Sequence, residues 1–105
     1  KGEAIGKEWV KYMKLEVSKE AAQWFINELY LEKGDSIKFF GKVYGENGFS
    51  FALDKVEPSR PEIEIEVEGI NFYIEKSDAW FFIDSDLIVT LDEKLKEPKY
   101  NYVKK

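Results

Sequence analysis

The segment "EIEIEVEGINFYIE" (Glu62–Glu75) decides the fold, because apolar and polar residues alternate in it on both sides of one Glu-Gly pair. If Glu68 and Gly69 form a two-residue turn, the two halves pair as antiparallel strands. One face of this hairpin then carries six apolar residues: Ile63, Ile65, Val67, Ile70, Phe72 and Ile74. The other face is predicted to be exposed to solvent and to carry three cross-strand pairs: Glu66 beside Asn71, Glu64 beside Tyr73, and Glu62 beside Glu75. A slip of one residue would invert both faces, so the pattern predicts this register as well as the hairpin.

Alternation with a period of two predicts two further strands before the hairpin, at Ser36–Tyr44 and Phe49–Val56. They flank the stretch "GENG" (Gly45–Gly48), in which Asn47 and Gly48 suit a tight hairpin turn. We expect this stretch to turn the chain. The other interpretation is that it cradles a ligand.

A helix is predicted after a short strand at Lys14–Val17. Ser18 suits the N-cap position, and Gly34 is expected to end the helix. Trp24 lies beside the apolar stripe, where we expect it to cover the edge of the core. The stripe itself has helical spacing and consists of Ala22, Phe25, Ile26 and Leu29.

The C-terminal third is predicted to contain a helical turn and two strands. Ser77 and Asp78 suit the start of a short helical turn through "AWFF", and a buried strand is expected at Leu87–Leu91. A last strand is expected at Lys99–Val103. The fold class is therefore mainly β with one N-terminal α-helix (α+β), built as one compact domain.

Composition bounds the class of protein. The chain has 105 residues, of which 44% are hydrophobic, and a formal net charge of −5. This size suits one domain with a real core, and the acidic charge disfavours binding to phosphate backbones. No apolar run approaches the roughly 20 residues that cross a bilayer. We therefore expect a cytoplasmic protein with no nucleic-acid or membrane partner.

The domain is expected to span residues 13–105. Residues 1–12 are interpreted as an N-terminal extension, either upstream sequence or a non-native segment. The other interpretation is a native strand or helix that packs through Ile5, Trp9 and Val10.

The chain contains neither cysteine nor histidine. This excludes disulfides, thiolate nucleophiles, Cys/His zinc sites and an imidazole base. Asp84 and Asp86 share the opening spacing of a calcium loop, but the glycine and the distant glutamate of that loop are missing. The glutamates at positions 62, 64, 66 and 68 are expected to be a solvated strand face. No nucleophile–base pair stands out, so we do not expect an enzyme.

Trp80, Phe81 and Phe82 are three consecutive large rings that cannot all enter one core from one short segment. At least one ring is expected at the surface or in contact with another chain. These residues are the candidate interaction site. The other interpretation is a peripheral part of the core.

The order of elements resembles the HesB/IscA-like domain of A-type iron–sulphur carriers, and more closely a short, uncharacterised Bacillus-type branch of that family. The resemblance covers residues 13–103 and rests on three stretches: "LEVSKEAAQWF", "VEPSRPEIEIEVEGINFYIE" and "SDAWFFIDSDLIV". It implies a β-sandwich or pseudo-barrel of short, mostly antiparallel strands.

The resemblance also locates the ligands that the carriers use. In carriers a cysteine lies in the turn that corresponds to "YGENG", and matching the following glycine to Gly48 puts Glu46 in its place. A C-G-C tail would begin near "NYVKK", so all three cysteine ligands are expected to be missing. Iron–sulphur clusters need soft thiolates, whereas Glu46 offers a hard oxygen.

Two functional hypotheses follow from this resemblance. The first is a protein of iron–sulphur cluster biogenesis that holds no cofactor and acts through protein partners or self-association. The second is a hard-metal or small-ligand binding domain that uses Glu46 and neighbouring oxygens.

Overall fold

The computed structural model describes residues 14–44, 48–82 and 85–104. The elements along the chain are β1 (Leu15–Val17), α2 (Lys19–Leu29), β2 (Ser36–Tyr44), β3 (Gly48–Lys55), β4 (Pro61–Val67), β5 (Ile70–Glu75), the 3₁₀ helix η1 (Lys76–Phe82), β6 (Ser85–Asp92) and β7 (Glu97–Lys104). The predicted class, mainly β with one N-terminal α-helix, is confirmed. The expected extension at residues 1–12 lies outside the described residues.

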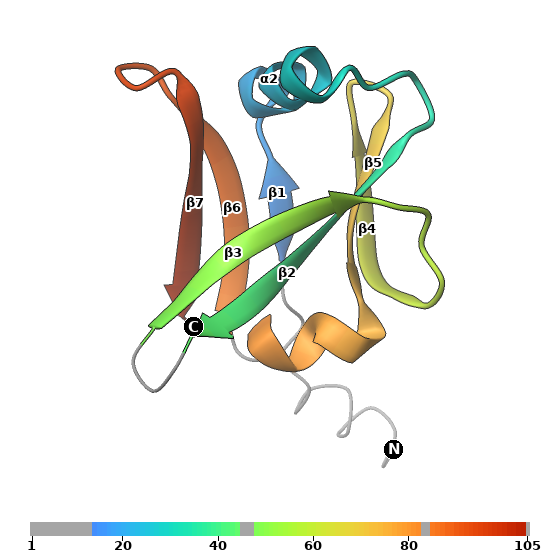
Figure 1. The fold of residues 1–105 in the computed structure, drawn as a ribbon, viewed down its shortest axis with the longest axis vertical. Coiled ribbons are helices and arrows are strands. Elements are labelled where there is room, and N and C mark those ends of the chain that lie inside the picture. Colours follow the sequence, from blue (N-terminus) through green and yellow to red (C-terminus); the bar gives the residue numbers. More distant parts are fainter. Residues whose placement is uncertain (1–13, 45–47, 83–84, 105) are drawn as a thin grey trace, which may run out of the picture.

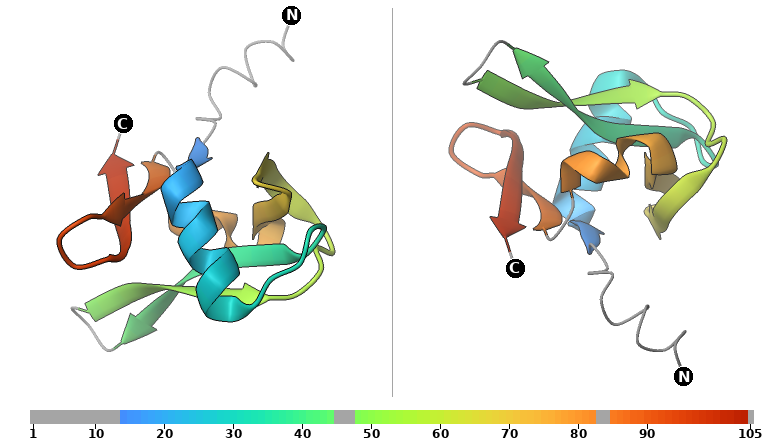
Figure 2. Two further views of the ribbon diagram at one scale, coloured as in Figure 1. Left: turned by 90° about the horizontal axis from the view of Figure 1, so that it is seen from above. Right: turned by 90° about the horizontal axis from the view of Figure 1, so that it is seen from below.

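The strands form two mixed sheets, with the orders β1-β6-β7 and β3-β2-β5-β4. The pairs β1–β6 and β2–β5 are parallel, and the other three pairs are antiparallel. Figure 1 shows α2 across one end of the space between the sheets and η1 at the other end. In the view from above in Figure 2, α2 runs between the two sheets, so its apolar stripe faces the core.

The predicted N-cap is confirmed, but the predicted end of the helix is wrong. The Ser18 hydroxyl accepts a hydrogen bond from the Ala21 amide at 3.0 Å. At the other end, the helix stops at Leu29, and Tyr30 takes the left-handed conformation with φ 54°. This early turn returns Leu31 to the core, where it is 7% exposed. Gly34, with φ 96°, lies in the following loop.

Trp24 covers the edge of the core, as predicted. Its indole N–H donates to the carbonyl of Lys96 at 2.9 Å, and its ring meets Phe25 edge-on at 5.4 Å. The helix is thereby joined to the turn between β6 and β7. Lys96 lies in that turn and has φ 57°.

The β4–β5 hairpin has the predicted register from Val67–Ile70 to Ile63–Ile74. Both turn residues, Glu68 and Gly69, have positive φ, as a two-residue hairpin of the favoured hand requires. The predicted pair of Glu62 with Glu75 is wrong, because the register shifts and Pro61 lies opposite Glu75. A proline lacks the N–H that a regular ladder needs, so the strand begins with an irregularity.

The prediction that the second face of the hairpin is exposed to solvent is wrong for β5. Tyr73 is fully buried and Glu75 is 8% exposed, although the facing glutamates of β4 are exposed. Their cover comes from residues 56–60, which connect β3 to β4 and pass over the outer side of the sheet. We call these residues the strap.

Aromatic rings join the two sheets. Phe39 and Phe72 stack at 5.8 Å in the four-stranded sheet. Tyr100 of the three-stranded sheet meets Phe39 at 6.3 Å and Phe51 at 5.8 Å. Each fully buried ring of this kind contributes about 1.5–3 kcal/mol through burial alone.

Candidate functional site

The predicted interaction residues lie on η1 in three different environments. Trp80 is 60% exposed, Phe81 is partly buried, and Phe82 is fully buried. Phe82 therefore belongs to the core, and only Trp80 presents most of its side chain at the surface. Whether another chain binds there stays a prediction.

Trp80 stands on a rigid support. Its ring meets Phe81 edge-on at 5.4 Å, and the carbonyl of Phe81 accepts a hydrogen bond from the Tyr102 hydroxyl at 2.7 Å. The Phe81 ring lies against the backbone of Gly41, where a Cβ atom would overlap it. An exposed tryptophan on a fixed base loses little conformational freedom when it is covered, which is typical of protein-binding anchors.

A second region is formed where the strap, which loops out beside the β4–β5 hairpin in Figure 1, is hydrogen-bonded to side chains of β5. The Tyr73 hydroxyl donates to the Val56 carbonyl at 2.6 Å. The Glu75 carboxylate accepts from the Ser59 amide at 2.6 Å and from the Arg60 amide at 2.8 Å. These bonds satisfy two buried polar side chains and hold the strap on the sheet.

A pocket of about 590 Å³ lies between the strap, β2, β5 and the start of η1. Its lining residues are Lys38, Val56, Glu57, Ser59, Arg60, Tyr73, Glu75, Lys76 and Ser77. The ammonium of Lys38 lies 3.9 Å from Asp78 Oδ2 and 5.1 Å from the centre of the Phe40 ring. Among the described residues, Asp78 Oδ2 is buried without a hydrogen-bond donor.

The electrostatics of the pocket argue against acid–base chemistry by its two buried groups. Burial, followed by the negative charges of nearby carboxylates, raises the pKa of Tyr73 to about 12. The pKa of Glu75 is lowered, chiefly by the Ser59 amide and against the effect of burial, with help from the Arg60 amide and Lys38. At neutral pH the phenol is therefore protonated and the carboxylate ionised, so neither is poised near the operating pH of a general catalyst.

The metal hypothesis finds no support in the described part of the chain. There, no group of three or more Asp or Glu side chains converges in a way that could hold a metal ion. Glu46 and Asp84 lie outside the described residues. Asp86 accepts a hydrogen bond from the Lys14 amide at 2.9 Å, which ties the start of β1 to β6. The glutamates at positions 62, 64, 66 and 68 are exposed, as predicted.

The comparison with solved structures defines the class. Escherichia coli SufA, described as involved in biosynthesis of iron–sulphur clusters, superposes with a TM-score of 0.60 at 16% identity, covering 87% of this chain and 82% of SufA. An Aquifex aeolicus protein superposes with a TM-score of 0.52 at 13% identity, covering 90% of this chain and 95% of that one. The chain thus has the HesB/IscA-like fold of SufA, without any cysteine.

Sequence comparison then identifies the family. The pyruvate dehydrogenase inhibitor of Bacillus subtilis is 36% identical over 94 residues, which are 86% of this chain and 99% of that protein. An uncharacterised protein of Staphylococcus saprophyticus is 34% identical over 95 residues, 84% of this chain and 97% of that protein. The chain belongs to the family of these short Bacillus and Staphylococcus proteins. No protein-family profile matches the sequence.

The sequence did not reveal the strap pocket. Lys38 and Tyr73 are 35 positions apart in the chain, and the parallel pairing of β2 with β5 places them side by side. The signal that was available is the segment "VEPSRP", whose two prolines indicate a break between the strand before it and the strand after it. Nothing in that segment indicates which strand it covers.

Proposed function

We propose that this chain is a non-enzymatic regulatory protein that binds pyruvate dehydrogenase and lowers its activity. The observation that carries the proposal is the 36% identity to the Bacillus subtilis pyruvate dehydrogenase inhibitor over 99% of that protein's length. A match from end to end at this identity supports a shared partner better than a match to one motif would.

The composition supports the part of the proposal that excludes cluster transfer. With no cysteine, the chain lacks the thiolates that iron–sulphur carriers use. A SufA-like fold at 16% identity supports a shared architecture, and the regulatory role would use that architecture as a protein-binding scaffold.

Trp80 is the proposed anchor of the contact. It is the large aromatic ring that η1 leaves 60% exposed, and its ring packs edge-on against Phe81. Replacing a hot-spot tryptophan with alanine costs a complex about 2 kcal/mol or more of binding free energy, which corresponds to about 30-fold in affinity.

The test uses purified pyruvate dehydrogenase complex of Bacillus subtilis. The chain is titrated into the pyruvate-dependent NADH-forming assay, and binding is measured in parallel by surface plasmon resonance. We expect dose-dependent inhibition, and a loss of affinity of about 30-fold for Trp80→Ala.

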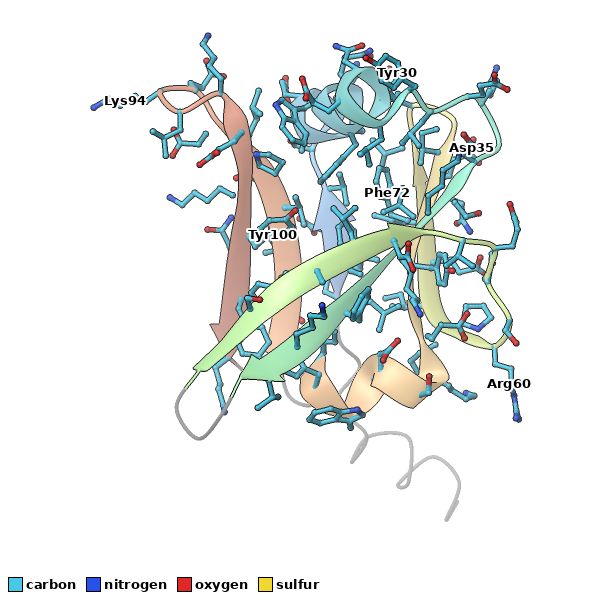
Figure 3. The ribbon with its side chains drawn as sticks, viewed as in Figure 1. Tyr30, Asp35, Arg60, Phe72, Lys94 and Tyr100 are labelled. Atoms are coloured by element: carbon cyan, nitrogen blue, oxygen red, sulfur yellow. The ribbon has the colours of Figure 1, made fainter. Side chains whose placement is uncertain are left out.

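Tyr30→Ala is the matched control, because Tyr30 is 86% exposed and lies at the opposite end of the molecule from η1 (Figure 3). It should inhibit as the unchanged chain does. Absence of both binding and inhibition would refute the proposed function. Inhibition that is indifferent to Trp80→Ala would refute only the placement of the contact.

A further inference from the structure

The edges of the two sheets differ in how they are protected against pairing with another chain. The edge strands are β1 and β7 in one sheet and β3 and β4 in the other. Natural proteins keep exposed edges short, interrupt them with proline or irregular pairing, or charge them. Three of these edges use such devices: β1 has three residues, β4 begins with Pro61 and a register shift, and β7 contains Pro98 beside Lys99.

The fourth edge, β3, lacks these devices over most of its length. All eight of its residues pair with β2 in one unbroken register. The strand contains no proline, and residues 48–53 carry no charge. Figure 1 shows β2 along one side of β3, and no strand in the described part of the chain pairs with the other side. The middle of the strand, at Phe51, Ala52 and Leu53, is partly exposed. β3 is thus a regular edge to which a further strand can be added.

Small side chains on β3 leave the outer surface of β2 within reach of such a strand. Phe51 packs against the core, so Ser50 and Ala52 lie on the face of β3 that points away from it. They pair with Lys42 and Phe40 of β2. Neighbouring strands are only about 4.8 Å apart. A large apolar side chain on the added strand can therefore lie over Ala52 and reach the partly exposed ring of Phe40.

Two charged residues favour one direction for the added strand. Lys42 is exposed and has no ion-pair partner among the described residues, so a carboxylate opposite Ser50 can reach it. Asp54, near the other end of β3, is also exposed and suits a basic residue on the added strand. An antiparallel strand would then carry a basic, an apolar and an acidic residue at alternate positions from its N-terminus.

We propose that the β3 edge binds an extended segment of a protein partner, which adds to the four-stranded sheet as an antiparallel strand. The segment has a basic residue opposite Asp54, a large apolar residue opposite Ala52 and a carboxylate opposite Ser50. Its intervening side chains cover the exposed parts of Phe51 and Leu53. A second copy of β3 fits less well, because its own serine and alanine cannot cover the ring beside Ala52. The proposal does not depend on the proposed function.

The test is a ¹H–¹⁵N NMR titration of the full chain with the peptide acetyl-Lys-Val-Phe-Val-Glu-amide. We expect the amides of residues 50–54 to shift with a dissociation constant of about 0.1–1 mM, because a short strand makes few contacts. The reversed peptide, acetyl-Glu-Val-Phe-Val-Lys-amide, has the same composition and places each charge beside a like charge in the antiparallel register. It should bind about fivefold more weakly.

Methylated peptides test whether the backbone pairs. In an added antiparallel strand, the N–H groups of alternate residues point toward β3 and the others point to solvent. One peptide is N-methylated at both valines, and another at the phenylalanine and the glutamate. One of the two should lose binding by about tenfold or more, and the other should keep it. Loss in both peptides, or in neither, would show that the peptide does not add as a strand and would overturn the proposal.

Variants locate the binding. Lys42→Gln should weaken the binding of the first peptide about three- to fivefold, because one exposed charge is removed. Lys94→Gln is the matched control, since Lys94 is an exposed lysine in the turn between β6 and β7 (Figure 3). No shift up to about 5 mM peptide, equal binding of the reversed peptide, or binding unchanged by Lys42→Gln would each overturn the proposal. Shifts of the same amides that grow with protein concentration alone would assign the edge to a second copy and overturn it as well.

Discussion

Replacing Gly41 with alanine should destabilise the protein because the Phe81 ring occupies the space that a Cβ atom would need. Gly41 pairs with Phe51 in the middle of the β2–β3 ladder, where alanine would otherwise be preferred over glycine. The overlap involves three carbon atoms of the ring. The ring cannot move freely, because it packs against Phe82 at 5.3 Å and Phe51 at 6.0 Å.

The magnitude follows from two opposing effects. Overpacking a core in this way costs about 1–3 kcal/mol, and the lower backbone entropy of alanine offsets about 0.5–1 kcal/mol. The expected net loss is about 1–2 kcal/mol, or roughly 4–16 °C in melting temperature for a domain of this size. Chemical and thermal unfolding followed by circular dichroism would measure it.

A double-mutant cycle tests the cause as well as the size. In a Phe81→Ala background the obstructing ring is gone, so Gly41→Ala should be neutral or stabilising there by up to about 1 kcal/mol. The coupling between the two positions should then reach about 2 kcal/mol. If the two changes were additive within about 0.5 kcal/mol, the ring would not be what excludes a side chain at Gly41.

Three further predictions concern the strap and the missing thiolates. Tyr73→Phe should lower the free energy of unfolding by about 1–2 kcal/mol in denaturant titrations at neutral pH, because the Val56 carbonyl loses its donor. Since the pKa of Tyr73 is raised from 10.0 to about 12 in the folded state, the phenol of the unfolded chain ionises first, and the loss caused by Tyr73→Phe should shrink as the pH rises above 10; a loss that stayed constant up to pH 12 would contradict the raised pKa. Because the pKa of Glu75 is lowered in the folded state, its ionised form adds stability above the ordinary value of 4.5, and this contribution is lost as the pH falls through the lowered pKa. The stability difference between the unchanged chain and Glu75→Gln should therefore shrink in acid, and a pH-independent difference would count against the two amide bonds. Anaerobic reconstitution of the purified chain should yield no stoichiometric iron and sulphide, and a stable cluster would revive the carrier hypothesis. In calorimetric titrations with ferrous or manganous ions, the unchanged chain and Glu46→Ala should give the same heat of binding. Ion binding that Glu46→Ala abolishes would revive the hard-metal hypothesis.

Much of the fold could be predicted because its strongest signals are local. The register of the β4–β5 hairpin follows from alternation around Glu68 and Gly69, and the N-cap of the helix follows from Ser18. The helix end was missed because burial of Leu31 favours an early turn at Tyr30, although a tyrosine is an unusual residue for left-handed φ. Here a tertiary contact outweighed a local preference.

The candidate sites could be predicted only in part, for the same physical reason. Three adjacent rings exceed what a short segment can bury, so the sequence alone indicated that η1 exposes an aromatic residue, and Trp80 is that residue. The burial of Tyr73 and Glu75 depends on a connection that crosses the sheet. Alternation along β5 reports the two faces of a strand and carries no information about what covers them.

The pairing of β1 with β6 has a consequence for biosynthesis. Leu15 lies opposite Leu87, so β1 can pair only after β6, about 70 residues further along the chain, has been synthesised. The four-stranded sheet is complete in sequence by Glu75, whereas β6 and β7 follow it. Contacts of such long sequence separation slow folding, and a nascent chain released early would expose the apolar side of α2. The three-stranded sheet therefore cannot form before β6 and β7 have been synthesised.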